Sequence, residues 1–214
     1  VQIQEIIDEP CEVLPDLGRL VGEKRFLILY AGSLIPVKGV HNLIQAVTEL
    51  SKIYPQIYLV LAGKKPLPND SNFDYYRQLV NLSEGKEKNV FFWGWVDHAN
   101  LVRCYKYFNL SVLLSKEQEG NSLFLMESIV QGTPVLASRL GGIPEVVDEG
   151  YTGLLIDDPD DINDIKLKIS KMIEDKVFYL QLRKNCLKIG RERFSYHRAA
   201  KELDQFISQV VAGN

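Results

Sequence analysis

The sequence lacks long apolar runs and any excess of basic residues. No apolar stretch approaches the roughly 20 residues that a helix needs to cross a bilayer, and no signal peptide is recognisable. The 25 Lys and Arg residues are outnumbered by 28 Asp and Glu, for a formal net charge of −3. A nucleic-acid or polybasic membrane surface would need the opposite balance. We therefore expect a cytoplasmic globular protein that binds no nucleic acid.

Cysteine and histidine are also scarce. The three cysteines are widely spaced and form no CxxC pair: Cys11, Cys104 and Cys186. Such usage is typical of reduced thiols in the cytoplasm. The three histidines, His41, His98 and His197, lie far apart and show no HxxH or HExxH spacing. We expect no metal site built by the protein.

The 214 residues are 46% hydrophobic and 25% charged, enough to bury a core in one large domain or two small ones. Residues 1–24 show no sustained period and contain two prolines, which predicts a lead-in or linker. Residues 25–214 are expected to form the domain. Because the first residue is Val, we expect the chain to be a piece of a longer protein.

Six short apolar segments recur along the chain, each bounded by glycine, proline or polar residues, and segments with helical spacing lie between them. Continuous apolar runs of this length are typical of parallel strands that are buried on both faces. We predict an α/β fold, a Rossmann-like doubly wound six-stranded parallel sheet with helices on both faces, followed by about three helices. The predicted strands are residues 26–31, 56–63, 89–93, 110–115, 134–138 and 153–156.

Ligands of such sheets bind outside the carboxyl ends of the strands. Five loops follow these ends and are expected to converge on one crevice. They contain Gly32, Gly63, Gly94, Glu119 and Gly141.

Residues 119–135 are predicted to run from loop to helix, turn and strand. Ser122 is expected to cap the helix through its hydroxyl, and Gly132 to end it in a left-handed conformation. At about 100° per residue, Leu123, Met126 and Val130 form one apolar stripe, and Glu127 falls inside it. An ionised carboxylate there needs a hydrogen-bond donor or a bound ligand, because burial without a partner costs several kcal/mol.

Glu119 precedes this helix, so its N-terminal amides lie between two acids. Such amides suit a phosphate and the carboxylates suit hydroxyls, which together favour a phosphorylated sugar. In the alternative, Glu119 is a favourable charge near a helix terminus and Glu127 is an edge residue paired with a lysine.

A second loop runs from Gly32 through Ser33 to Lys38 and Gly39. It would let backbone amides and Lys38 approach an anion, although it matches neither GxGxxG nor the Walker pattern. A lysine such as Lys38, taken by itself, is more often a solvated surface residue. Trp93 and Trp95 would share one sheet face by alternation, which favours core packing for both.

Four motifs, over about residues 26–212, together resemble the C-terminal domain of the GT4 family of retaining glycosyltransferases, which have the two-domain GT-B fold. They are Gly32-x-Leu34-x-x-x-Lys38-Gly39, the pair Glu119 and Glu127, Gly132-x-Pro134-Val135 leading to Gly141-Gly142-Ile143-Pro144-Glu145, and Thr152-Gly153-Leu154-Leu155. The combination, in this order and at these spacings, is specific.

The resemblance implies a nucleotide-diphosphate sugar donor, such as a UDP-, GDP- or ADP-sugar, with no resident cofactor and no metal at the diphosphate. It places Lys38 on the diphosphate, Glu119 on the donor sugar and Glu127 on the ribose hydroxyls, with Lys38 and Glu119 as the catalytic pair. The remaining donor-binding positions are Gly32, Ser33, Gly94, Val96, Gly120, Asn121, Ser122 and Leu123, of which Gly94 and Val96 would meet the nucleobase.

The resemblance also implies a partner domain. An N-terminal domain would bind a saccharide or lipid-linked acceptor, and peripheral attachment to a membrane would be a property of the complete protein. Without the N-terminal domain, the chain is expected to bind the donor but to transfer little sugar to an acceptor.

Two positions depart from the family. Ser33 stands where Arg is usual, so one cation at the diphosphate is absent, and Arg139 is the sequence-based candidate to replace it. Asn121-Ser122 stands where Phe-Gly is common. The departures leave two alternatives open, a non-catalytic nucleotide-sugar binding or scaffold domain and another GT-B enzyme, such as an epimerase or phosphorylase.

Overall fold

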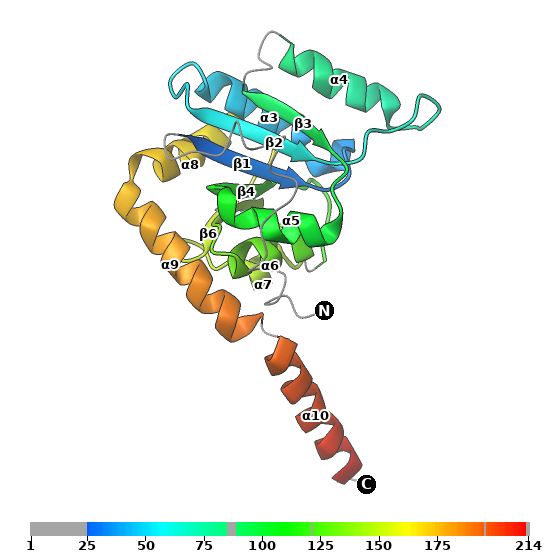
Figure 1. The fold of residues 1–214 in the computed structure, drawn as a ribbon, viewed down its shortest axis with the longest axis vertical. Helices are drawn as coiled ribbons and strands as arrows, with labels where there is room; N and C mark the ends of the chain where they lie inside the picture. Colours follow the sequence, from blue (N-terminus) through cyan, green and yellow to red (C-terminus); the bar gives the residue numbers. More distant parts are fainter. Residues whose placement is uncertain (1–24, 85–88, 121, 195, 213–214) are drawn as a thin grey trace.

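The structure is a computed structural model that describes residues 25–84, 89–120, 122–194 and 196–212 (Figure 1). The predicted lead-in, residues 1–24, lies outside the described residues. Six strands form one all-parallel sheet in the order β3-β2-β1-β4-β5-β6, which confirms the predicted fold class. The strands are β1 (Phe26–Ala31), β2 (Ile57–Ala62), β3 (Val90–Gly94), β4 (Leu110–Leu113), β5 (Val135–Ser138) and β6 (Gly153–Ile156).

Helices cover both faces of the sheet because alternate residues of each buried strand point to opposite sides. Ile28 and Tyr30 belong to a core shared with α3 (Val40–Leu50), α4 (Phe73–Ser83) and α8 (Ile162–Glu174). Leu27 and Leu29 belong to a second core, on the other face, shared with α5 (His98–Cys104) and η2 (Tyr105–Tyr107).

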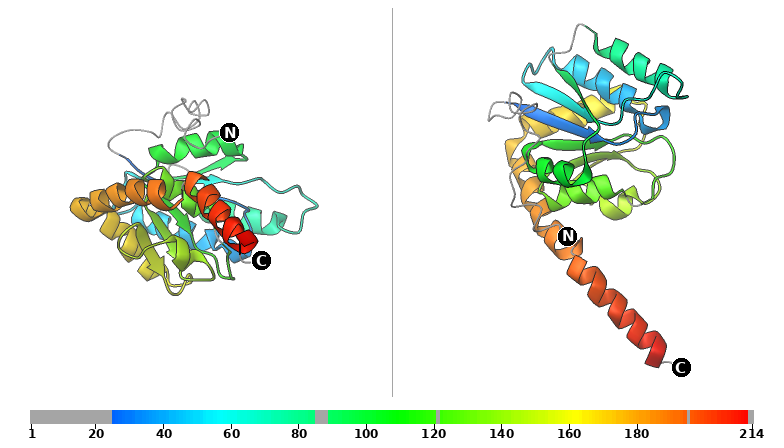
Figure 2. Two further views of the ribbon diagram at one scale, coloured as in Figure 1. Left: turned by 90° about the horizontal axis from the view of Figure 1, so that it is seen from below. Right: turned by 45° about the vertical axis from the view of Figure 1, so that its right-hand side comes forward.

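The remaining helices are η1 (Pro36–Lys38), α6 (Leu123–Val130), α7 (Ile143–Val146), α9 (Lys176–Arg193) and α10 (Tyr196–Ala212). Buried residues of α6 and α9 belong to the same core as Ile28 and Tyr30. The predicted three C-terminal helices are α8, α9 and α10. Helix α9 runs along the body and α10 extends away from it (Figures 1 and 2). Among the described residues, no helix combines the length and the apolar character that crossing a membrane requires.

Helix α6 buries a different face from the one predicted. Leu125 and Ile129 are fully buried, whereas Leu123 is 66% exposed. The predicted stripe was wrong because almost every residue of this helix is apolar, so its sequence does not single out one face. Glu127 is nevertheless buried, as expected.

Trp95 is 72% exposed, so its predicted core packing is wrong, whereas Trp93 does pack against the core that includes Phe108. The reason lies in Gly94, whose φ of 82° ends the regular strand between the two tryptophans. Strand alternation therefore does not extend to Trp95.

The expectation of reduced cysteines is correct for Cys186, a buried free thiol whose pKa is raised to about 12 by burial. It is wrong for Cys104, which is disulfide-bonded. A disulfide depends on how close the fold brings two cysteines, and their spacing in the sequence does not show this.

Candidate functional site

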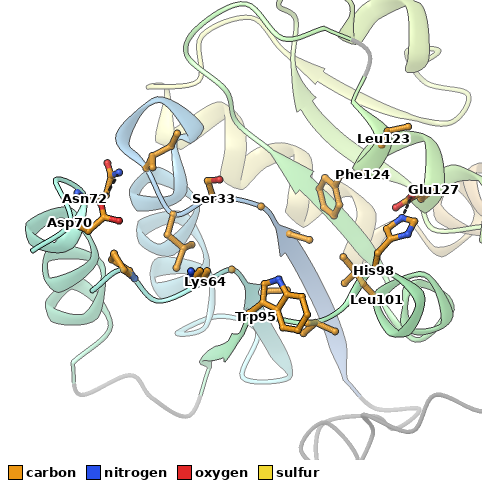
Figure 3. Close-up of a pocket in the computed structure, with 18 of the residues that line it drawn as sticks. Ser33, Lys64, Asp70, Asn72, Trp95, His98, Leu101, Leu123, Phe124 and Glu127 are labelled. Atoms are coloured by element: carbon orange, nitrogen blue, oxygen red, sulfur yellow. Dashed lines mark hydrogen bonds and ion pairs between the residues drawn. The ribbon is translucent and has the colours of Figure 1, made fainter. Parts of the chain in front are cut away.

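A cavity of about 680 Å³ lies at the carboxyl ends of β1, β2 and β3 (Figure 3). It is lined by the loops after these strands and by residues of α5, η2 and α6. The sheet order reverses between β1 and β4, and such a switch point is where doubly wound sheets bind ligands. The cavity therefore occupies the position at which this fold accommodates small molecules.

Glu127 lines this cavity from α6 with both carboxylate oxygens engaged. His98 Nε2 donates to Oε1 at 2.5 Å, and the Tyr105 hydroxyl donates to Oε2 at 3.1 Å. Burial, and then the adjacent Glu127 carboxylate, raise the pKa of Tyr105, which keeps its proton on the hydroxyl as the donor. Each carboxylate oxygen retains acceptor capacity, so Glu127 is able to bind two further hydroxyl donors.

These contacts decide between the two interpretations of Glu127. The carboxylate is held by a histidine and a tyrosine, and no lysine pairs with it among the described residues. Its environment is that of a positioned acceptor at a cavity wall.

A second acidic group, Glu119, lies outside the cavity lining. The Lys38 ammonium, at the end of η1, forms an ion pair with Glu119 in the loop between β4 and α6. Ser115 Oγ donates to the same carboxylate oxygen at 2.5 Å. Lys116 N donates to Val37 O at 2.8 Å and joins the two loops through their backbones. The structure thus brings together the two residues that were predicted as the catalytic pair.

The glycines at 141 and 142 hold the backbone of Glu119. Gly142 N donates to Glu119 O at 2.8 Å, and a Cβ built on Gly141 would lie 2.1 Å from that oxygen. Only glycine permits so close an approach, and its φ of +57° at position 141 adds to the requirement. The Gly-Gly motif therefore helps to position the loop that carries Glu119.

Some of the predicted site residues line the cavity and others do not. Gly32, Ser33, Val96, Leu123 and Glu127 line the cavity. Asn121 lies outside the described residues. The described residues that do not line it are Lys38, Gly94, Glu119, Gly120, Ser122 and Arg139.

Ser122 stands at the N-cap position of α6, but its side chain makes no capping hydrogen bond, contrary to expectation. Its backbone φ and ψ, −75° and 106°, place the residue in the extended region usual for a cap. Ser122 thus leaves the first amides of α6 without a capping hydroxyl.

Arg139 does not take the position proposed from sequence. Its guanidinium pairs with Asp157 at 2.6 Å and with Glu149 at 2.9 Å, outside the cavity lining. Because both carboxylates come from distant positions, the sequence alone does not show that this charge is already neutralised. Arg139 therefore brings no unpaired charge to the cavity lining.

Sequence reasoning missed several polar residues of the cavity, among them Lys64, Asp70, His98 and Tyr105 as a hydrogen-bond donor. Lys64 directly follows Gly63 at a predicted strand end, which is a usable signal. His98 begins α5 after the N-cap Asp97, and nothing in its spacing indicates a contact with Glu127.

A separate titratable cluster links α3 to the loop that leads to Glu119. His41 Nδ1 lies 2.8 Å from the Tyr75 hydroxyl, and its Nε2 lies 3.1 Å from the Lys116 ammonium, which also pairs with Asp160. Burial is the main cause that lowers the pKa of His41, Lys116 lowers it further, and Asp160 opposes both. The neutral imidazole is the form that accepts from Lys116.

This cluster predicts a pH dependence of stability. A histidine with a lowered native pKa binds protons more weakly when folded, so the free energy of unfolding should fall as pH drops below about 6.5. Urea denaturation of wild type and His41→Gln between about pH 7.5 and 5 tests this. We expect a shallower pH slope for the variant, and equal slopes would refute the assignment.

The fold and site define an α/β domain with a polar cavity at the switch point of a parallel sheet. The chain belongs to the family described as glycosyl transferases group 1, whose profile matches residues 19–193. Spore coat protein SA of Bacillus subtilis is 28% identical over 192 residues, which are 90% of this chain and 50% of that protein. The chain spans about half the length of the curated relatives it matches.

Solved structures show the same fold. Sucrose-phosphate synthase from Thermosynechococcus elongatus is 25% identical with a TM-score of 0.81, covering 100% of this chain and 52% of that one. Anabaena HepE, solved in complex with UDP-glucose, is 24% identical with a TM-score of 0.81, covering 98% and 56%. In both comparisons, the aligned region is about half of the solved protein's own chain.

Proposed function

We propose that this chain binds a nucleotide-diphosphate sugar in the cavity at the β1/β4 switch point. The observation that carries the proposal is the buried Glu127 carboxylate, which His98 and Tyr105 orient at the cavity wall. A ribose offers two adjacent hydroxyls, which match its two oxygens. The HepE complex with UDP-glucose supports a donor of this class.

The other roles follow from position. Lys38 and the uncapped amides at the start of α6, from Ser122 and Leu123, would bind the diphosphate, with Gly32, Ser33 and Gly120 beside it. Glu119 would contact the donor sugar, and Gly94 and Val96 the nucleobase. Asn121, although outside the described residues, belongs to the same proposed loop.

For the reaction, we propose transfer of the sugar with retention at the anomeric carbon, as in the GT4 family. Cleavage of the bond to the diphosphate develops negative charge on the leaving group, which Lys38 and the helix amides would stabilise. The acceptor would attack from the same face, and the leaving phosphate would take its proton. The new glycosidic bond thus replaces the bond to the diphosphate.

We further propose that residues 25–214 form the donor-binding half of a two-domain GT-B enzyme, with residues 1–24 as the linker. The acceptor, a saccharide or a lipid-linked saccharide, would bind the other domain. A cytoplasmic location and peripheral membrane attachment are proposed for the complete protein.

Calorimetric titration of the chain with UDP, GDP, ADP and their common sugar conjugates tests the proposed donor. A specific ligand should raise the free energy of unfolding by about 2.7 kcal/mol at a hundredfold excess over its dissociation constant. Inorganic diphosphate serves as the control for charge alone. Absence of binding by all three nucleotides would contradict the proposal, and sugar transfer by the chain alone would contradict the need for a second domain.

A further inference from the structure

The charged residues of the cavity do not balance an incoming diphosphate. Glu127 and Asp70 both line it and both carry carboxylates. Glu119 offsets part of the charge of the Lys38 ammonium with which it pairs, and Arg139 is held by two carboxylates outside the cavity. A diphosphate bound there needs a further cation, because burying anionic oxygens near carboxylates without compensation is unfavourable.

Lys64 lines the cavity and makes no ion pair within the part of the chain that the structure describes. Figure 3 shows it near Ser33 and Trp95, across the cavity from Glu127 and His98. A lysine ammonium is a flexible point charge that suits phosphate oxygens. Among the described residues that line the cavity, Lys64 is the one lysine or arginine.

The sheet register explains why Lys64 is close to Ser33. Strands β1 and β2 pair in parallel with Ala31 opposite Ala62, and Gly32 N donates to Ala62 O at 2.9 Å. A Cβ built on Gly63 would lie 2.5 Å from Gly32 O, so the segments that follow β1 and β2 remain in contact beyond the strands. Ser33 directly follows Gly32, and Lys64 directly follows Gly63. Because neighbouring parallel strands lie about 4.8 Å apart, the two residues leave the sheet side by side.

We propose that Lys64 supplies the second positive charge that binds the donor diphosphate, at the place where Ser33 offers only a hydroxyl. Lys38 would approach from the η1 side and Lys64 from the end of β2. The inference rests on the proposed function, since it assigns a subsite of the same cavity.

Lys64→Ala and the matched control Lys65→Ala test the proposal. Lys65 is the adjacent exposed lysine, and its ammonium lies over the Tyr76 ring and outside the cavity lining. Binding of UDP, GDP and ADP, and of uridine, guanosine and adenosine, is measured by calorimetry at low and high salt. For the nucleoside diphosphate that binds wild type, Lys64→Ala should lose about tenfold or more in affinity.

The affinity for the corresponding nucleoside should remain unchanged, and so should both affinities of Lys65→Ala. The salt dependence of diphosphate binding should become weaker in Lys64→Ala. Adding Ser33→Arg to Lys64→Ala should restore diphosphate affinity, because the new guanidinium enters from the neighbouring strand end. Circular dichroism confirms that each variant is folded.

Three results would overturn the proposal: Lys64→Ala binds the diphosphate like wild type, it loses nucleoside affinity equally, or Ser33→Arg restores nothing. If wild type binds none of the three diphosphates, the proposed function itself fails and Lys64 loses its role with it. The nucleoside and wild-type measurements therefore separate the two failures.

Discussion

Replacing Glu127 with Ala should weaken binding of the donor nucleotide by about 10- to 150-fold, since hydrogen bonds to a charged group contribute about 1.5–3 kcal/mol. The loss follows from removing both carboxylate oxygens from the cavity wall. Glu127→Gln keeps one acceptor oxygen and most of the side-chain shape, so it should lose less affinity. Calorimetric titration with the nucleotide that binds wild type measures all three proteins.

Glu192→Ala is the matched control for this change. This substitution also removes a glutamate carboxylate, but from an exposed position on α9 outside the cavity lining. It should leave the affinity for the nucleotide unchanged. Glu127→Ala also leaves the buried Tyr105 hydroxyl without its acceptor, which costs about 1–3 kcal/mol of stability. Titrations are therefore run at a temperature well below the midpoint of thermal unfolding of each variant. An unchanged affinity of folded Glu127→Ala would contradict the assignment of the ribose site.

Replacing Gly39 with Ala should destabilise the domain by about 2–5 kcal/mol, combining left-handed backbone strain of about 1–2 with overpacking of about 1–3. Gly39 has a φ of +63°, and a Cβ there would lie 2.2 Å from Leu114 O. Leu114 directly follows β4, so the substitution would separate the loop that carries Lys38 from the loop that carries Glu119. Urea denaturation measures the change in the free energy of unfolding.

Gly150→Ala separates the two causes. Gly150 has a φ of +72° and no atom within 4 Å of a built Cβ, so Ala there adds only backbone strain. We expect this control to cost about 1–2 kcal/mol. Equal losses for the two variants would show that the contact with Leu114 is unimportant, and the role assigned to Gly39 would be wrong.

The strands were predictable because continuous apolar runs between glycine and proline residues have few structural interpretations. A local signal also identified Gly132, whose φ of 77° ends α6. Such features depend on neighbours in the sequence. They are therefore visible before the fold is known.

What sequence reasoning missed depends on contacts between distant residues. The pairing of Arg139 with Asp157 and Glu149 joins three different segments, and His98 reaches Glu127 from another helix. The role proposed for Lys64 depends on the cavity that it lines and on the register of β1 and β2. A cavity at the carboxyl ends of the strands could thus be predicted from the sequence, whereas the electrostatic partners of the residues around it could not.

The central claim is that the cavity at the β1/β4 switch point holds a nucleoside diphosphate sugar. A crystal structure of the chain with the nucleotide identified by titration tests it most directly. We predict ribose hydroxyls within hydrogen-bond distance of Glu127 and a diphosphate between Lys38, Lys64 and the first amides of α6. A nucleotide bound elsewhere, or with its ribose away from Glu127, would contradict the account.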